Sequence, residues 1–102
     1  MAVYNKLIRD KIPAIIQQTG SKANTCILSD EEYRVCLERK LDEEVGEFHR
    51  DHTVEELADI LEVVYALAAT YGCSREQLEV TYQTKHETKG GFERKLFLIS
   101  TE

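Results

Sequence analysis

Residues 57 to 71 are apolar on nearly every side when they are drawn as a helix. Thr53 and Glu56 have the spacing of a capping box, and Gly72 follows Tyr71, so we predict a helix from about Thr53 to Tyr71. Such a helix has to be covered on all sides, because exposed apolar surface is unfavourable in water. A chain of 102 residues has few other helices to surround it. The sequence therefore predicts a dimer or a higher oligomer in which these helices form a bundle.

Three further helices are predicted from start signals and apolar spacing. Each begins with a proline in its first turn or with a capping box. They extend over residues 12–20, 29 to about 49, and 74 to about 85. Two short β-prone runs, residues 25–28 and 95–99, are expected to pair as a ribbon. We thus predict a single domain, residues 1–102, of the all-α class: a four-helix bundle with a minor two-stranded β ribbon, completed by dimerisation.

The chain contains 13 Lys and Arg against 19 Asp and Glu, which gives a net charge of −6 at pH 7. An acidic protein lacks the basic patches that attract nucleic acid and anionic membranes, so neither is an expected partner. The longest apolar run, residues 63–69, is far shorter than the roughly 18 residues of a membrane helix, and the first six residues do not resemble a secretory signal. We therefore expect a cytoplasmic protein with three reduced cysteines.

The acidic residues are concentrated in one part of the chain. Residues 42–62 contain nine Asp or Glu and one Arg, a local charge of −8, which leaves +2 for the rest. On a helical wheel Glu44 falls within about 20° of Leu37, in the middle of the apolar stripe of the second helix. Glu47 lies one turn further on, near the edge of that stripe. A solvated Glu would not occupy this position, so we predict that both carboxylates point inward.

A second acidic pair, Glu56 and Asp59, repeats this spacing in the next helix. The connecting loop is short, so the two helices should be antiparallel, which sets Glu47 against Glu56 and Glu44 against Asp59. Converging carboxylates in a partly buried site raise one another's proton affinity unless a cation neutralises them. Oxygen-only ligands favour Mg²⁺, with Mn²⁺ as the alternative ion. The predicted ligands are Glu44, Glu47, Glu56 and Asp59.

Basic residues near both ends of the chain offer cations for phosphate oxygens. Mg²⁺ in proteins commonly completes its coordination with substrate phosphates, so an anionic substrate would need such residues beside the metal. The predicted substrate-binding residues are Lys6, Arg9 and Lys85, and the alternatives are Lys89, Arg94 and Lys95. Glu43, Glu55 and Glu62 are acidic neighbours that could replace a metal ligand or orient its water.

The strings KLDEEVGE (residues 40–47) and EELADILE (residues 55–62) resemble the metal motif of the MazG-like, all-α nucleoside triphosphate pyrophosphohydrolases and of the related phosphoribosyl-ATP pyrophosphohydrolases. Residues 4–13 and 85–92 resemble the ends of a small, single-domain branch of this superfamily. The resemblance implies a dimeric or higher helical enzyme that uses Mg²⁺ to split a nucleoside triphosphate, including a noncanonical one, into a monophosphate and pyrophosphate. It also implies that the four predicted metal ligands are the catalytic residues.

Other interpretations of these residues stay open. An acidic helix is usually a solvated face, and Glu56 has a local role as the third residue after Thr53. His49 and His52 lie at a predicted turn and are interpreted as surface residues, not as metal ligands. The alternative functions are a phosphoribosyl-ATP pyrophosphohydrolase and a non-catalytic, divalent-cation-binding helical oligomerisation module. A screen of nucleotides for pyrophosphate release would separate these functions.

Overall fold

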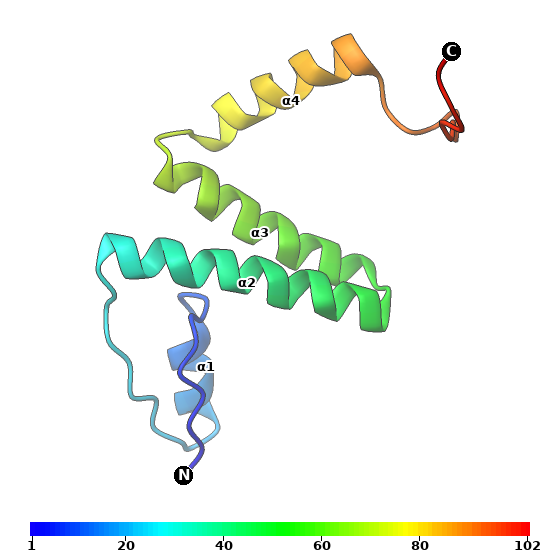
Figure 1. The fold of residues 1–102 in the computed structure, drawn as a ribbon. Helices are drawn as coiled ribbons and strands as arrows, with labels where there is room; N and C mark the ends of the chain where they lie inside the picture. Colours follow the sequence, from blue (N-terminus) through cyan, green and yellow to red (C-terminus); the bar gives the residue numbers. More distant parts are fainter.

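The computed structural model describes all 102 residues and contains four helices and no strands (Figure 1). The helices are α1 (Ile12–Gln18), α2 (Asp30–Asp51), α3 (Val54–Thr70) and α4 (Arg75–Lys89). Each predicted helix is present, and the prediction of an all-α fold is confirmed. The second and fourth helices end two and four residues later than the sequence predicted.

Capping explains where the three long helices begin. The side chains of Ser29 and Ser74 each accept a hydrogen bond from the backbone N–H three residues on, and the side-chain oxygen of that third residue accepts one from the backbone N–H of the cap. Two of the three predicted capping boxes are thus formed. At Thr53 only half of the box exists: its hydroxyl accepts from Glu56 N at 3.3 Å, and the Glu56 carboxylate caps nothing. The prediction of a full box there was wrong, and the Glu56 side chain is free for another role.

Helices α2 and α3 form an antiparallel hairpin that is the centre of the fold (Figure 1). Only two residues separate them, and His52 adopts the left-handed conformation, with φ of 54°, that reverses the chain. Leu37 of α2 and Val63 of α3 are the two buried apolar side chains. The interface between these helices is therefore where the carboxylates of both acidic pairs can meet.

The other two helices do not complete a bundle. Helix α4 packs only against α3, makes an angle of 105° with it and points away from the hairpin, and α1 packs against no other helix (Figure 1). The radius of gyration is 18.0 Å, whereas a compact domain of this length has about 13 Å. The prediction of a four-helix bundle is therefore wrong for one chain. Dimerisation is not tested by a single chain and stays a prediction.

The predicted β ribbon is also wrong. Residues 25–28 and 95–99 are both irregular, and Ile27, Phe97 and Ile99 are 88% or more exposed. Residues 95–99 follow α4 at its far end and residues 25–28 precede α2, so the two runs lie on different parts of an extended chain (Figure 1). An isolated two-stranded ribbon has little stability in water, and here no helix face covers either segment.

No single helix has both the length and the apolar character that crossing a membrane requires. Helices α3 and α4 together have the length and composition of a membrane span, but the chain bends by 105° between them.

Candidate metal centre

Glu44 is the one charged side chain buried in this fold. It lies on the face of α2 that meets α3, and only 7% of the residue is exposed. One carboxylate oxygen, Oε1, is 3.5 Å from Lys40 Nζ, while Oε2 is buried without a hydrogen-bond donor. A buried carboxylate oxygen normally has a partner, because its desolvation is otherwise uncompensated. Glu44 Oε2 is therefore a polar atom that nothing in the chain satisfies.

Three of the four carboxylates predicted to converge meet across the two helices, and the fourth, Glu47, lies beside Glu44 on α2. Oxygen atoms of Glu44, Glu56 and Asp59 are all within 4.8 Å of one another, which joins both helices. Oxygen atoms of Glu43, Glu44 and Glu47 meet the same distance limit along α2. Glu44 belongs to both groups, and we call these five residues the carboxylate cluster. Their role as metal ligands stays a prediction.

The geometry of the hairpin explains this convergence. A turn of two residues forces α3 to run back along α2, so residues at equal distances from the turn are placed side by side. Glu44 and Glu47 are three residues apart, as are Glu56 and Asp59, and this spacing keeps each pair on one helix face. The cluster thus follows from local spacing and one short turn.

Repulsion and burial shift the proton affinities within the cluster. Burial raises the pKa of the Glu44 carboxyl above its ordinary value, and the neighbouring carboxylates of Glu47 and Asp59 raise it further, whereas Lys40 acts in the opposite direction. Partial burial also raises the pKa of Glu56, with added repulsion from Glu47, Asp51 and Asp59. Glu44 and Glu56 therefore hold protons more tightly than free carboxylates do, as expected where negative charges lack a counter-ion.

Two of the predicted substrate-binding residues lie beside the cluster. Lys6 Nζ is 3.5 Å from Glu43 Oε1. Arg9 Nη1 donates to Asp59 Oδ1 at 3.2 Å, and its Nη2 donates to Glu62 Oε1 at 3.1 Å. The Lys6 and Arg9 side chains are about half exposed, so both cations remain accessible to an anion in solvent. The segment before α1 is thus held against the hairpin by cations that surround the carboxylates.

Lys85 is not brought to the cluster within one chain. It lies in the C-terminal part of α4, it is exposed, and it forms no ion pair. Helix α4 contacts α3 but not α2, and it diverges from the hairpin toward its C-terminal end (Figure 1). The role of Lys85 in substrate binding stays a prediction, and it would require that Lys85 of a second copy reach the cluster.

Sequence reasoning missed Lys40, which is the cation closest to the buried carboxylate. Its ammonium is 3.6 Å from Glu43 Oε2 and 3.5 Å from Glu44 Oε1, and its side chain is only 15% exposed. The signal was present, because Lys40 precedes these residues by three and four positions on one helix. Its charge offsets part of the repulsion in the cluster.

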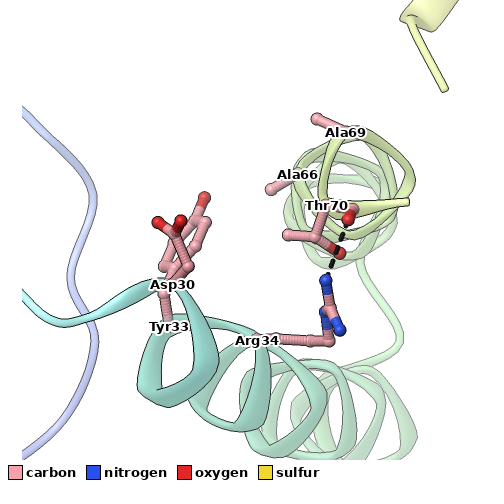
Figure 2. A pocket seen from close by; sticks show the side chains of 6 residues that line it. All are labelled: Asp30, Tyr33, Arg34, Ala66, Ala69 and Thr70. Atoms are coloured by element: carbon pink, nitrogen blue, oxygen red, sulfur yellow. Dashed lines mark hydrogen bonds between the residues drawn. The ribbon is translucent and has the colours of Figure 1, made fainter. Parts of the chain in front are cut away.

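A hollow with a volume of about 330 Å³ lies at the end of the hairpin that is farther from its turn (Figure 2). Small residues of α3 leave space facing the start of α2, and Arg34 Nη2 donates to the carbonyl oxygen of Thr70 at 3.0 Å across it. It is lined by Asp30, Tyr33, Arg34, Ala66, Ala69 and Thr70. None of the clustered carboxylates lines this hollow, so the two features are separate.

The donor set of the carboxylate cluster fits a hard divalent cation. All of its ligand atoms are carboxylate oxygens, which suit Mg²⁺ or Mn²⁺ better than softer metals. The unsatisfied Glu44 Oε2 is the atom that such a cation would neutralise. Exposed acidic groups are common without any metal, but burial of Glu44 between two helices distinguishes this cluster from a solvated face.

No protein-family model matches this chain, and no solved structure matches it. A protein of Mycolicibacterium smegmatis that is described as an uncharacterized protein is 44% identical over 48 residues. These residues make up 47% of this chain and 49% of that protein, so the match spans about half the length of the relative. The similarity identifies a related sequence and assigns it no activity.

Proposed function

We propose that this protein is a Mg²⁺-dependent nucleotide pyrophosphohydrolase of the MazG-like superfamily. It would cleave a nucleoside triphosphate, including a noncanonical one, between its α and β phosphates to give a monophosphate and pyrophosphate. The observation that carries the proposal is the buried Glu44, whose Oε2 has no partner and which faces carboxylates of a second helix. That arrangement supports a cation site, and the cations next to it support an anionic substrate.

Each group of residues has a distinct task in the proposed reaction. Glu44, Glu47, Glu56 and Asp59 would hold the metal, and Glu43 is a fifth carboxylate within reach of the same site. When bound, Mg²⁺ supplies positive charge that neutralises phosphate oxygens and favours attack by water. An ionised carboxylate of the cluster would accept a proton from the attacking water.

The basic residues orient the phosphates. Lys6 and Arg9 now pair with Glu43, Asp59 and Glu62, all of which are partly exposed. Once the cluster is neutralised, the same ammonium and guanidinium groups are free to donate to phosphate oxygens, for which the planar guanidinium is well suited. Lys40 stays beside Glu44 and limits the repulsion there.

The test is pyrophosphate release from a panel of nucleotides with and without Mg²⁺. We expect Glu44→Gln, Glu47→Gln, Glu56→Gln and Asp59→Asn each to lower turnover by at least about a hundredfold, because each removes charge that positions the metal. Glu38→Gln is the matched control, since Glu38 is exposed on α2 and forms no ion pair. Activity close to wild type in any two of the four variants would refute the carboxylate site.

Substrate choice and the non-catalytic alternative are decided by the same screen. Preferential hydrolysis of phosphoribosyl-ATP would assign the second candidate activity, which uses the same four carboxylates. Mg²⁺ binding without hydrolysis of any nucleotide would indicate a cation-responsive binding module.

We also propose that the protein works as a dimer or higher oligomer in the cytoplasm. Only Leu37, Val63 and Glu44 are buried in one chain, so a single copy has almost no core. A second copy would cover the apolar surface of α3 that α2 and α4 leave open. Sedimentation at micromolar concentration should therefore show a dimer or a larger species, and a folded, soluble monomer would contradict this expectation.

A further inference from the structure

The C-terminal arm, residues 92–99, is the most exposed apolar segment of the molecule. Five large apolar side chains within these eight residues are between 76% and 96% exposed. They are Phe92, Leu96, Phe97, Leu98 and Ile99. Burial of large apolar side chains is favourable in water, so an arm left exposed forgoes a large stabilisation. A second apolar surface that packs against the arm would recover this stabilisation.

An exposed apolar stripe on α3 offers such a surface. Val54, Leu57 and Leu61 follow one another at intervals of three and four residues, which places them on one helix face. They are 77%, 47% and 46% exposed. Val63, which is buried, lies about 180° away from Val54 around the helix and faces α2. The stripe is therefore on the side of α3 that α2 does not cover.

The arm is far from this stripe in its own chain. Helix α4 departs from the C-terminal end of α3, carries the chain about 21 Å further, and points away from the hairpin (Figure 1). The arm follows Gly90, whose φ of 79° ends α4 at that distant point. The stripe begins at the opposite, N-terminal end of α3. The stripe of a second copy is subject to no such restriction.

Charge favours the same pairing. Residues 85–95 contain four cations and two acids, a net charge of +2, whereas residues 42–62 sum to −8. Glu55 and Glu62 both lie on one side of the stripe, about 80–100° around α3 from Val54, and Glu55 has no ion pair within the chain. Arg94 and Lys95, directly before the apolar run of the arm, can pair with these carboxylates.

We propose that the C-terminal arm of each chain docks on the Val54–Leu57–Leu61 stripe of a second copy. If each large side chain loses roughly 150 Å² of exposed surface, two exchanged arms bury roughly 1,500 Å², which falls within the range of stable interfaces. The exchange places Arg94 and Lys95 on the helix that carries Glu56 and Asp59 of the second copy. This inference rests on the self-association part of the proposed function and is independent of the hydrolytic chemistry.

Sedimentation of point variants of the full chain is the first test. Phe97→Asp on the arm and Leu61→Asp on the stripe should each weaken dimerisation by at least about tenfold while helix content, followed by circular dichroism, is unchanged. Ile27→Asp is the matched control, because Ile27 is fully exposed and lies outside both features. A dimer that persists in both variants would overturn the arm exchange and leave the dimer itself standing, whereas a monomeric wild type would overturn both.

Disulfide cross-linking identifies which chain the arm contacts. Two differently tagged chains, one with Leu98→Cys and the other with Leu57→Cys, are mixed after their three native cysteines are changed to serine. Cross-links between the two tags are expected. If a chain that carries both substitutions forms only an intramolecular disulfide, the arm folds back onto the stripe of its own chain. If no disulfide forms at all, the arm does not contact the stripe. Binding of a monomer to phosphatidylserine vesicles, lost in Phe97→Asp, would instead make the arm a membrane anchor and refute the proposal.

Discussion

Replacement of Glu44 by Gln should weaken divalent-metal binding more than replacement of any other clustered carboxylate. Glu44 is the residue that belongs to both groups of converging oxygens, so its loss removes a ligand and a negative charge from each. Glu47 belongs to one group, and Asp59 belongs to the other. Gln keeps the size and one carbonyl oxygen of the side chain, so packing against α3 is preserved.

The size of the effect follows from charge and burial. Two opposite unit charges about 4 Å apart attract by about 4 kcal/mol at an effective dielectric constant of about 20, and a divalent ion doubles this. Dehydration of the ion and of the carboxylate offsets more than half of that attraction. We therefore expect Glu44→Gln to cost about 3 kcal/mol, roughly a hundredfold in Kd, and Glu47→Gln to cost about tenfold.

Isothermal titration calorimetry with Mg²⁺ or Mn²⁺, in the absence of nucleotide, measures these constants directly. Glu38→Gln should bind as wild type does, because Glu38 is exposed and unpaired. If Glu44→Gln binds the metal within about threefold of wild type, Glu44 is not a ligand and its buried oxygen needs another explanation.

Two further predictions concern pH and substrate binding. Burial raises the pKa of Glu44 in the folded chain above the ordinary value of 4.5 that applies to the unfolded chain, so the folded chain binds this proton more tightly. The stabilisation that comes from this proton is fully present below pH 4.5 and is lost as the pH rises through the folded pKa. Thermal melts of the metal-free protein should therefore show that Glu44→Gln is more stable than wild type at pH 7 and that this gain disappears below about pH 4. An equal gain at both pH values would exclude titration of Glu44 as the cause. Lys6→Met and Arg9→Met should raise KM for a nucleotide, or lower kcat, because each removes a proposed phosphate contact. Neither should weaken Mg²⁺ binding, because each removes a cation that pairs with the carboxylates. Wild-type kinetics in both variants would mean that other residues contact the phosphates.

The carboxylate cluster was predictable because each step toward it is local. Capping residues mark where α2 and α3 begin, helical spacing keeps each acidic pair on one face, and a turn of two residues leaves one way to fold the hairpin. Burial of Glu44 followed from its place beside Leu37 in the apolar stripe. These rules involve residues close together in sequence, so no distant contact had to be known.

The contacts of the long side chains were not predictable in the same way. Arg9 reaches Asp59 and Glu62, 50 and 53 residues away, which depends on where the segment before α1 lies against the hairpin. Sequence suggested that Arg9 and Lys6 would lie near phosphate, but not which carboxylates they would contact. Several rotatable bonds and many acidic neighbours make such pairings a matter of tertiary arrangement.

The sequence by itself determined the helices, the single turn that pairs α2 with α3, and the convergence of acidic side chains from both of these helices. The tertiary structure alone decided that residues 95–99 form no strand, that α4 turns away through 105°, and that Lys85 lies far from the carboxylates. The physical reason is the range of the interactions: hydrogen bonds and caps act within a few residues, whereas the direction of α4 and the cover of apolar surface depend on packing between distant segments. In this chain that packing buries only Leu37, Val63 and Glu44, so local signals define the candidate site and long-range contacts define everything around it.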